Sequence, residues 1–198
     1  MLVFWKQRLV ILSTPKTGST ALETALEVVA SLAVARPPEL KHTPAYRFER
    51  FLRPYLQNSA GGAPFTVTAL MREPIDWLGS WYRFRQRSDL DGSDRSTRDL
   101  TFAEFVEGYM QTPRPAFADV GSQAKFLSGA DGRLPGVDLI FRYEEIERFV
   151  AFLEERLGMP IDLPRINVSP RGTLELPASV GARLREALAA EYALYEGL

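Results

Sequence analysis

Residues 9–20 read LVILSTPKTGST, an apolar run that gives way to a loop of proline, lysine and glycine. The run Leu9–Leu12 is short and continuous, which favours a strand buried on both faces of a sheet. From Ser19 to about Val34 the apolar residues follow helical spacing, and the stripe consists of Leu22, Leu26, Val29 and Ala33. The segment therefore predicts a strand, a tight loop and a helix, in that order.

The loop Thr14–Thr20 has the components of an anion site. A strand that turns into a helix presents free backbone N–H groups and the positive end of the helix dipole at one place. Lys16 adds a charge, Gly18 lets the backbone approach a ligand, and the hydroxyls that follow can donate to phosphate oxygens. The loop is not a Walker A motif, because the lysine precedes the only glycine by two positions. A capped helix with a solvent-facing lysine is the purely structural alternative.

A second signal lies in residues 71–82, which read MREPIDWLGSWY. Arg72 is expected at the carboxyl end of a strand, and Ser80 about two turns into a helix that begins at Pro74. Both then reach the same sheet edge as the first loop, where a guanidinium fork and a hydroxyl can hold a second phosphate. The structural alternative is an arginine paired with Glu73 or Asp76.

The rest of the chain alternates strand and helix patterns. Strands are predicted at 65–71 and 137–141, and helices at 45–57, 102–110, 121–127, 143–157 and 177–195. In the 45–57 helix the expected apolar stripe is Phe48, Phe51, Leu52 and Tyr55. Residues 88–99 lack periodicity, which indicates an exposed loop and a candidate lid. We expect one α/β domain over residues 1–198, with a mainly parallel central sheet flanked by helices and a P-loop-like nucleotide-binding fold.

Composition excludes several classes of function. The formal net charge is −1, from 24 basic and 25 acidic residues, so no global field attracts nucleic acid. The chain has no cysteine and one histidine, which removes disulfides, thiolate metal sites and multi-histidine metal sites. The apolar N-terminal stretch is too short to span a bilayer and lacks a signal cleavage site. We expect a cytoplasmic protein without a membrane span.

These two motifs resemble those of sulfotransferases that use 3′-phosphoadenosine 5′-phosphosulfate (PAPS). The stretch Pro15–Thr20 is similar to their 5′-phosphosulfate loop, and Arg72 with Ser80 is similar to their 3′-phosphate motif. The resemblance is to the carbohydrate branch, which includes heparan sulfate 2-O-sulfotransferases and short bacterial relatives. Weaker similarity extends to residues 123–127, 137–145 and 166–169.

The resemblance implies a donor site and its residues. It implies that the 5′-phosphate and the sulfuryl group are held by Pro15, Lys16, Thr17, Gly18, Ser19 and Thr20. Arg72 and Ser80 would bind the 3′-phosphate, and Arg171 with Gly172 would belong to a late loop that closes over the nucleotide. The expected reaction moves a sulfuryl group from PAPS to a hydroxyl of a carbohydrate or glycan-like acceptor, and leaves 3′-phosphoadenosine 5′-phosphate (PAP) without a metal.

Catalysis of such a transfer requires a cation on the leaving side and a base for the acceptor. Lys16 is the candidate cation. His42 is the candidate base because it is the only imidazole, with Glu23, Glu39 and Glu49 as alternatives.

Several side chains near Ser80 have a structural interpretation. We expect Arg83, Arg85 and Arg87 to be solvated and to lie on different helix faces, and Trp77, Trp81 and Tyr82 to be core.

Two other functions remain open from the sequence. One is a P-loop kinase that uses ATP and magnesium, and the other is a nucleotide-binding module without chemistry. The acceptor and the oligomeric state have no recognisable signal in the sequence.

Overall fold

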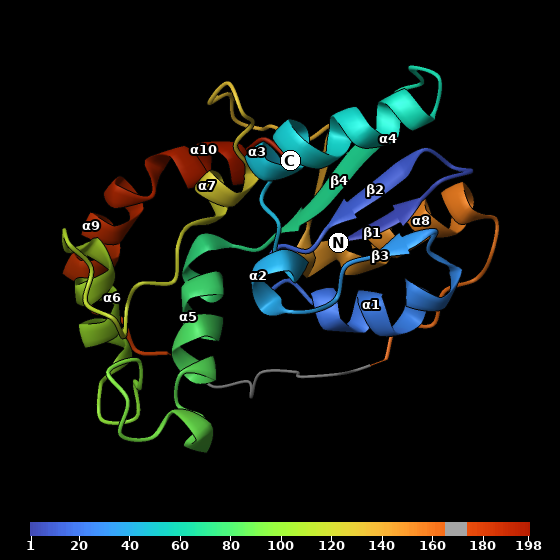
Figure 1. The fold of residues 1–198 in the computed structure, drawn as a ribbon. Coiled ribbons are helices and arrows are strands. Elements are labelled where there is room, and N and C mark those ends of the chain that lie inside the picture. The colour runs from blue at the N-terminus through green and yellow to red at the C-terminus, as the bar shows by residue number, and fades with distance from the viewer. Residues whose placement is uncertain (165–173) are drawn as a thin grey trace.

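A computed structural model describes residues 1–164 and 174–198, and its centre is one five-stranded sheet (Figure 1). From one edge to the other, the strands are β3 (Leu32–Ala33), β1 (Leu2–Phe4), β2 (Leu9–Leu12), β4 (Thr66–Met71) and β5 (Leu139–Arg142). The predicted strands at 9–12 and 65–71 are confirmed, and the one at 137–141 is confirmed with a shift of two residues at its start. An α/β fold with helices around the sheet is therefore correct.

The sheet is mixed rather than mainly parallel. β2, β4 and β5 run parallel, with Leu12 opposite Ala69 and Met71 opposite Arg142. β1 is antiparallel to both β2 and β3. Only four residues, Trp5–Arg8, separate β1 from β2, and so short a connection can join only antiparallel neighbours. The parallel part nevertheless places the ends of β2, β4 and β5 at one edge, as expected.

Both faces of the central strands are buried. Val10 and Leu12 pack with side chains from three helical segments, α3 (Ala45–Arg47), α4 (Arg53–Ser59) and α7 (Gln123–Leu127). Leu9 and Ile11 point to the opposite face, where α1 (Ser19–Leu26) and α8 (Ile146–Leu157) cover them. A continuous apolar run is the expected pattern of such a strand.

The first helix is shorter than predicted. α1 ends at Leu26, a 3₁₀ turn η1 (Glu27–Val29) follows, and Ala33 lies in β3 instead of on the helical stripe. Ala33 pairs with Leu2 of β1, so sheet hydrogen bonds override the helical periodicity there. Val29 is consequently 44% exposed.

The 45–57 helix forms in three pieces, because a π-helical turn η2 (Phe48–Leu52) separates α3 from α4. Phe48 and Leu56 are buried, whereas Phe51 and Tyr55 are 64% and 69% exposed. A π turn rotates the following residues relative to a regular helix. The predicted apolar stripe is therefore wrong at Phe51 and Tyr55.

The remaining helices form a third core beside the sheet. α5 (Pro74–Phe84) leads away from the sheet edge to α6 (Phe102–Met110) and α9 (Ala178–Ala187), as Figure 1 shows. The predicted C-terminal helix is divided at Leu188 into α9 and α10 (Ala189–Glu196). The other short elements are α2 (Pro38–Lys41), η3 (Ser88–Leu90) and η4 (Tyr143–Glu145). No helix in the two described ranges is long and apolar enough to cross a membrane.

Candidate functional site

The loop between β2 and α1 has a strained backbone, and the helix that follows it has no side-chain cap. Lys16 has a φ of 65° and Gly18 a φ of 74°, so two residues of this loop adopt the left-handed region. The Thr17 hydroxyl donates to the Thr14 carbonyl at 2.9 Å and closes the turn. No side chain in the described part of the chain caps α1. The N-terminal N–H groups of this helix are therefore suited to an anion.

Gly18 is required by its neighbours as well as by its backbone angle. A Cβ at this position would lie 3.2 Å from Cε2 of Tyr143. Any larger residue would need both a disfavoured φ and a shift of the Tyr143 ring. The loop therefore packs closely against the segment that follows β5.

Arg72 joins the end of β4 to the loop. Its Nη1 donates to the Lys16 carbonyl at 3.1 Å, and the guanidinium carbon lies 4.8 Å from the centre of the Tyr143 ring. Its Nε also donates to Asp76 at 2.6 Å. Both interpretations of Arg72 from the sequence are therefore partly realised: it reaches the first loop, and it forms the ion pair with Asp76.

Sequence reasoning missed the role of Gln123. This residue is 1% exposed, and its side-chain amide binds both backbone groups of Arg72. Its Oε1 accepts from the Arg72 N–H at 2.9 Å, and its Nε2 donates to the Arg72 carbonyl at 2.8 Å. The side chain thus fixes the backbone of the arginine, and the only sequence signal was a polar residue at the start of a short helix.

Ser80 lies in α5 and is 3% exposed. Residues 76, 80 and 83 are spaced by four and three, so Asp76, Ser80 and Arg83 share one face of the helix. The structure therefore places Ser80 on the same face as the carboxylate that pairs with Arg72.

The ammonium group of Lys16 lies against aromatic rings. Nζ is 3.9 Å from the centre of the Phe84 ring and 5.4 Å from that of Trp81. Burial, followed by repulsion from the nearby arginines 72, 87 and 83 in that order, lowers the pKa of Lys16 to about 8. A lysine in this position loses its charge far more readily than an exposed one.

The three arginines after Ser80 have different partners. Arg85 is buried and donates to the carbonyls of Ala116 and Asp119, so the prediction that it is solvated is wrong. α5 ends at Phe84, so Arg85 and Arg87 lie beyond it and the prediction of three arginines on separate faces of a continuing helix is wrong. Arg83 and Arg87 both lie near enough to Lys16 to lower its pKa.

The aromatic residues of α5 are mostly core, as expected. Trp77 and Tyr82 are buried in the third core, and Trp81 packs against it. Trp77 also donates from Nε1 to the Pro15 carbonyl at 2.9 Å, which holds α5 against the loop.

His42 follows α2 and has a defined tautomer. Its Nδ1 lies 2.6 Å from the Ser13 carbonyl. Because a carbonyl oxygen can only accept, Nδ1 carries the proton and Nε2 keeps its lone pair. Burial lowers the pKa of His42, with the Ser13 contact opposing and Lys41 adding to that shift. The ring is therefore neutral at physiological pH.

The three alternative bases lie in different surroundings. Glu23 is buried beside the loop, accepts from Ser13 Oγ at 3.1 Å and pairs with Lys41 Nζ at 2.7 Å. Glu39 is exposed on α2. Glu49 accepts from the Ala130 N–H at 2.6 Å and pairs with Arg133 at 2.8 Å. These partners lie 81 and 84 residues later in the chain, outside the loop. Among these three, only Glu23 contacts the loop region.

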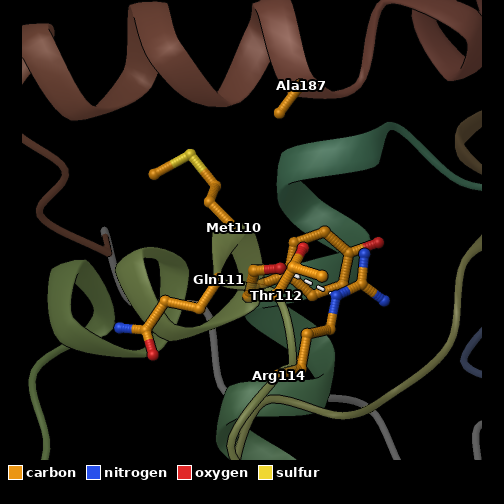
Figure 2. A pocket seen from close by; sticks show the side chains of 6 residues that line it. Met110, Gln111, Thr112, Arg114 and Ala187 are labelled. Carbon is orange, nitrogen blue, oxygen red and sulfur yellow. Dashed lines mark hydrogen bonds between the residues drawn. The ribbon is translucent and has the colours of Figure 1, made fainter.

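A pocket of about 380 Å³ lies away from these residues (Figure 2). Its lining comes from the end of α6, the segment after it and the last residue of α9: Tyr109, Met110, Gln111, Thr112, Arg114 and Ala187. Arg114 donates from Nε to the Tyr109 carbonyl at 2.8 Å, the contact drawn as a dashed line in Figure 2. None of the predicted site residues that the structure describes lines this pocket, so we place the candidate site at the loop, where the charged groups converge.

Arg171 and Gly172, which the sequence assigns to a late nucleotide-binding loop, lie outside the described residues. None of the protein-family models compared with this chain matches it. No curated protein matches it significantly. The geometry above therefore carries the functional argument.

Proposed function

We propose that this protein is a PAPS-dependent sulfotransferase that acts on a hydroxyl of a carbohydrate or glycan-like acceptor. The observation that carries the proposal is the contact between Arg72 and the Lys16 carbonyl. It joins the two elements that we propose to bind anions, which are 56 residues apart in the sequence. A donor with phosphates at both its 5′ and 3′ positions needs two such elements side by side.

The residues present fit a doubly phosphorylated nucleotide. The uncapped start of α1, with the hydroxyls of Ser19 and Thr20, would hold the 5′-phosphosulfate. Arg72 and Ser80 would hold the 3′-phosphate. Arg72 supplies a guanidinium charge beside its ion pair with Asp76, and Ser80 lies on the same helix face as Asp76. The donor would supply the sulfuryl group, and PAP would be the product.

Lys16 is the proposed cation for the leaving oxygen. Its present contact with Phe84 is a cation–π interaction, which is worth about 0.5 to 2 kcal/mol. A phosphosulfate, with its full negative charge, is a stronger partner for an ammonium group in a partly buried site. We therefore propose that Lys16 leaves the rings when the donor binds.

His42 is the proposed general base. Nε2 has its lone pair available because the Ser13 carbonyl fixes the proton on Nδ1. The lowered pKa of His42 keeps this nitrogen unprotonated near neutral pH. Glu23 is the less suitable base, since a lysine and a hydroxyl already occupy its oxygens.

The proposal includes two finer features of the protein. One is a P-loop-like arrangement of the strand, the loop and α1, supported by the parallel pairing of β2 with β4. The other is activity in the cytoplasm, supported by the absence of cysteine from the chain. Fractionation of the native host with a tagged chain tests the second feature.

A thermal-shift experiment tests the donor. PAP at 100 times its dissociation constant should stabilise the protein by about 2.7 kcal/mol, because it binds only the native state. ATP with magnesium should give a much smaller shift. Arg50→Ala, an exposed arginine on η2, is the matched control and should behave as the unmodified protein. A larger shift with ATP and magnesium than with PAP would favour a kinase, and no shift with either would refute a nucleotide site.

A mass-spectrometric screen tests the transfer itself. Candidate acceptors are incubated with the protein and PAPS and are examined for the mass gain of one sulfuryl group. A gain that disappears with His42→Ala supports the assigned chemistry. Binding of PAP without a product on any glycan, lipid or small alcohol would instead favour a binding module.

A further inference from the structure

Two guanidinium groups, that of Arg72 at the end of β4 and that of Arg83 on α5, compete for one carboxylate of α5. Asp76 Oδ2 lies 2.6 Å from Arg72 Nε, while Asp76 Oδ1 lies 3.6 Å from Arg83 Nη2. The first contact is a charge-assisted hydrogen bond, and the second is too long to be a hydrogen bond. Asp76 is therefore already hydrogen-bonded to Arg72, and Arg83 has only a longer electrostatic contact with it.

The neighbourhood of Arg83 has an excess of positive charge. Lys16 lies close enough for Arg72, Arg83 and Arg87 to lower its pKa by repulsion. Among residues 1–164 and 174–198, the carboxylates that pair with these three arginines are Asp76 and Asp89, the latter 3.0 Å from Arg87. The positive groups therefore outnumber the carboxylates that pair with them.

The side chain of Arg83 is held in place but not satisfied. It is 16% exposed, and its Nε is buried without an acceptor among residues 1–164 and 174–198. Its Nη1 and Nη2 both lie 3.7 Å from the point where a Cβ on Gly79 would stand, an ordinary van der Waals distance, so the guanidinium lies against the helix at this residue. Cδ1 of Leu174 lies 2.5 Å from the same point, so Gly79 makes room for the leucine. A buried hydrogen-bond donor without a partner is unfavourable, and an acceptor on a ligand would remove that cost.

We propose that Arg83 binds a tetrahedral oxyanion, a phosphate or sulfate ester, on the face of α5. Ser80 precedes Arg83 by three residues on the same face and offers a hydroxyl donor beside the fork. The site is a further specificity-determining position, one helical turn beyond Ser80. The oxyanion comes from the 3′-phosphate of the donor or from an acidic group of the acceptor, and this second step rests on the proposed function.

Calorimetric titrations with inorganic sulfate, PAP and adenosine 5′-phosphate test the site. Arg83→Ala should weaken sulfate binding by about tenfold or more, since a charged hydrogen bond is worth more than 1.4 kcal/mol, the equivalent of tenfold. Arg83→Lys keeps the charge without the fork and should give an intermediate loss. Arg50→Ala removes the same charge from an exposed position and should have no effect.

Asp76→Asn provides a test of opposite sign that does not depend on the fate of Arg83→Ala. It removes the internal competitor and should tighten sulfate binding severalfold. If Asp76→Asn weakens binding, or if Arg83→Ala binds all three ligands as the unmodified protein does, the proposal is wrong.

The titrations also separate the two sources of the oxyanion. A loss confined to PAP, with adenosine 5′-phosphate unaffected, assigns Arg83 to the 3′-phosphate. A loss of sulfate binding that persists under saturating PAP assigns it to an acceptor group. Arg83-dependent sulfate binding in a protein that does not bind PAP would support the oxyanion site and overturn the proposed function.

Discussion

The position of Lys16 predicts an unusual pH dependence of nucleotide binding. An ordinary lysine stays protonated until about pH 10.4, whereas the pKa of Lys16 is lowered to about 8 by burial and three arginines. The sign follows from the charge: the protonated form attracts phosphates, and this form is lost as the pH rises through 8. At pH 9 only about a tenth of Lys16 is charged, so PAP affinity should fall about tenfold between pH 7 and pH 9.

Calorimetry between pH 6.5 and pH 10 measures this effect without an acceptor. The second pKa of a phosphate lies near 6, so PAP itself scarcely titrates above about pH 7.5, where the loss of the Lys16 charge is measured. Binding near pH 9 should take up almost one proton, because the phosphates restore the charge of Lys16. Lys16→Arg is the matched control, since its guanidinium stays charged and should abolish the alkaline loss. A flat affinity up to pH 10 in the unmodified protein, or the same loss in Lys16→Arg, would refute the reasoning.

Three further predictions concern the rest of the site. Arg72→Ala and Ser80→Ala should weaken PAP binding but leave adenosine 5′-phosphate almost unchanged in calorimetry; equal losses for both ligands would contradict the 3′-phosphate assignment. His42→Ala should lower turnover by about 10²- to 10⁴-fold without changing PAP affinity, and full turnover in this variant would transfer the role of base to a carboxylate. The rate of the unmodified protein should fall as the pH decreases below 6.5, because burial lowers the pKa of His42. Gln123→Leu should lower the free energy of unfolding in urea by about 2 to 4 kcal/mol, because both buried backbone groups of Arg72 lose their partners; an unchanged midpoint would mean that water replaces the amide.

The parts of the fold that sequence reasoning predicted are those that local pattern determines. β2 and β4 are apolar runs, and α5 begins at a proline that suits the first turn of a helix. The meeting of Arg72 with the first loop followed from the rule that parallel strands end at one edge. These features need only short stretches of sequence.

The parts that were missed depend on partners far away in the chain. α1 stops at Leu26, and after the η1 turn Leu32 and Ala33 pair with β1, a three-residue strand without a readable period. Lys16 lies on Phe84 because α5 passes the loop, and the spacing of residues 14–20 holds no information on that. Gln123 acts on a residue 51 positions earlier. Such contacts are set by packing rather than by propensity.

The separate third core has a consequence for how the protein opens in solution. The loop belongs to the sheet, whereas Ser80 belongs to a helix whose Trp77 and Leu78 are buried with α6 and α9. Two units with separate apolar interiors can exchange their amide hydrogens at different rates. A nucleotide that grips both units would couple these opening reactions, so slower exchange should extend into α6 and α9, which contribute no residue to the proposed donor site.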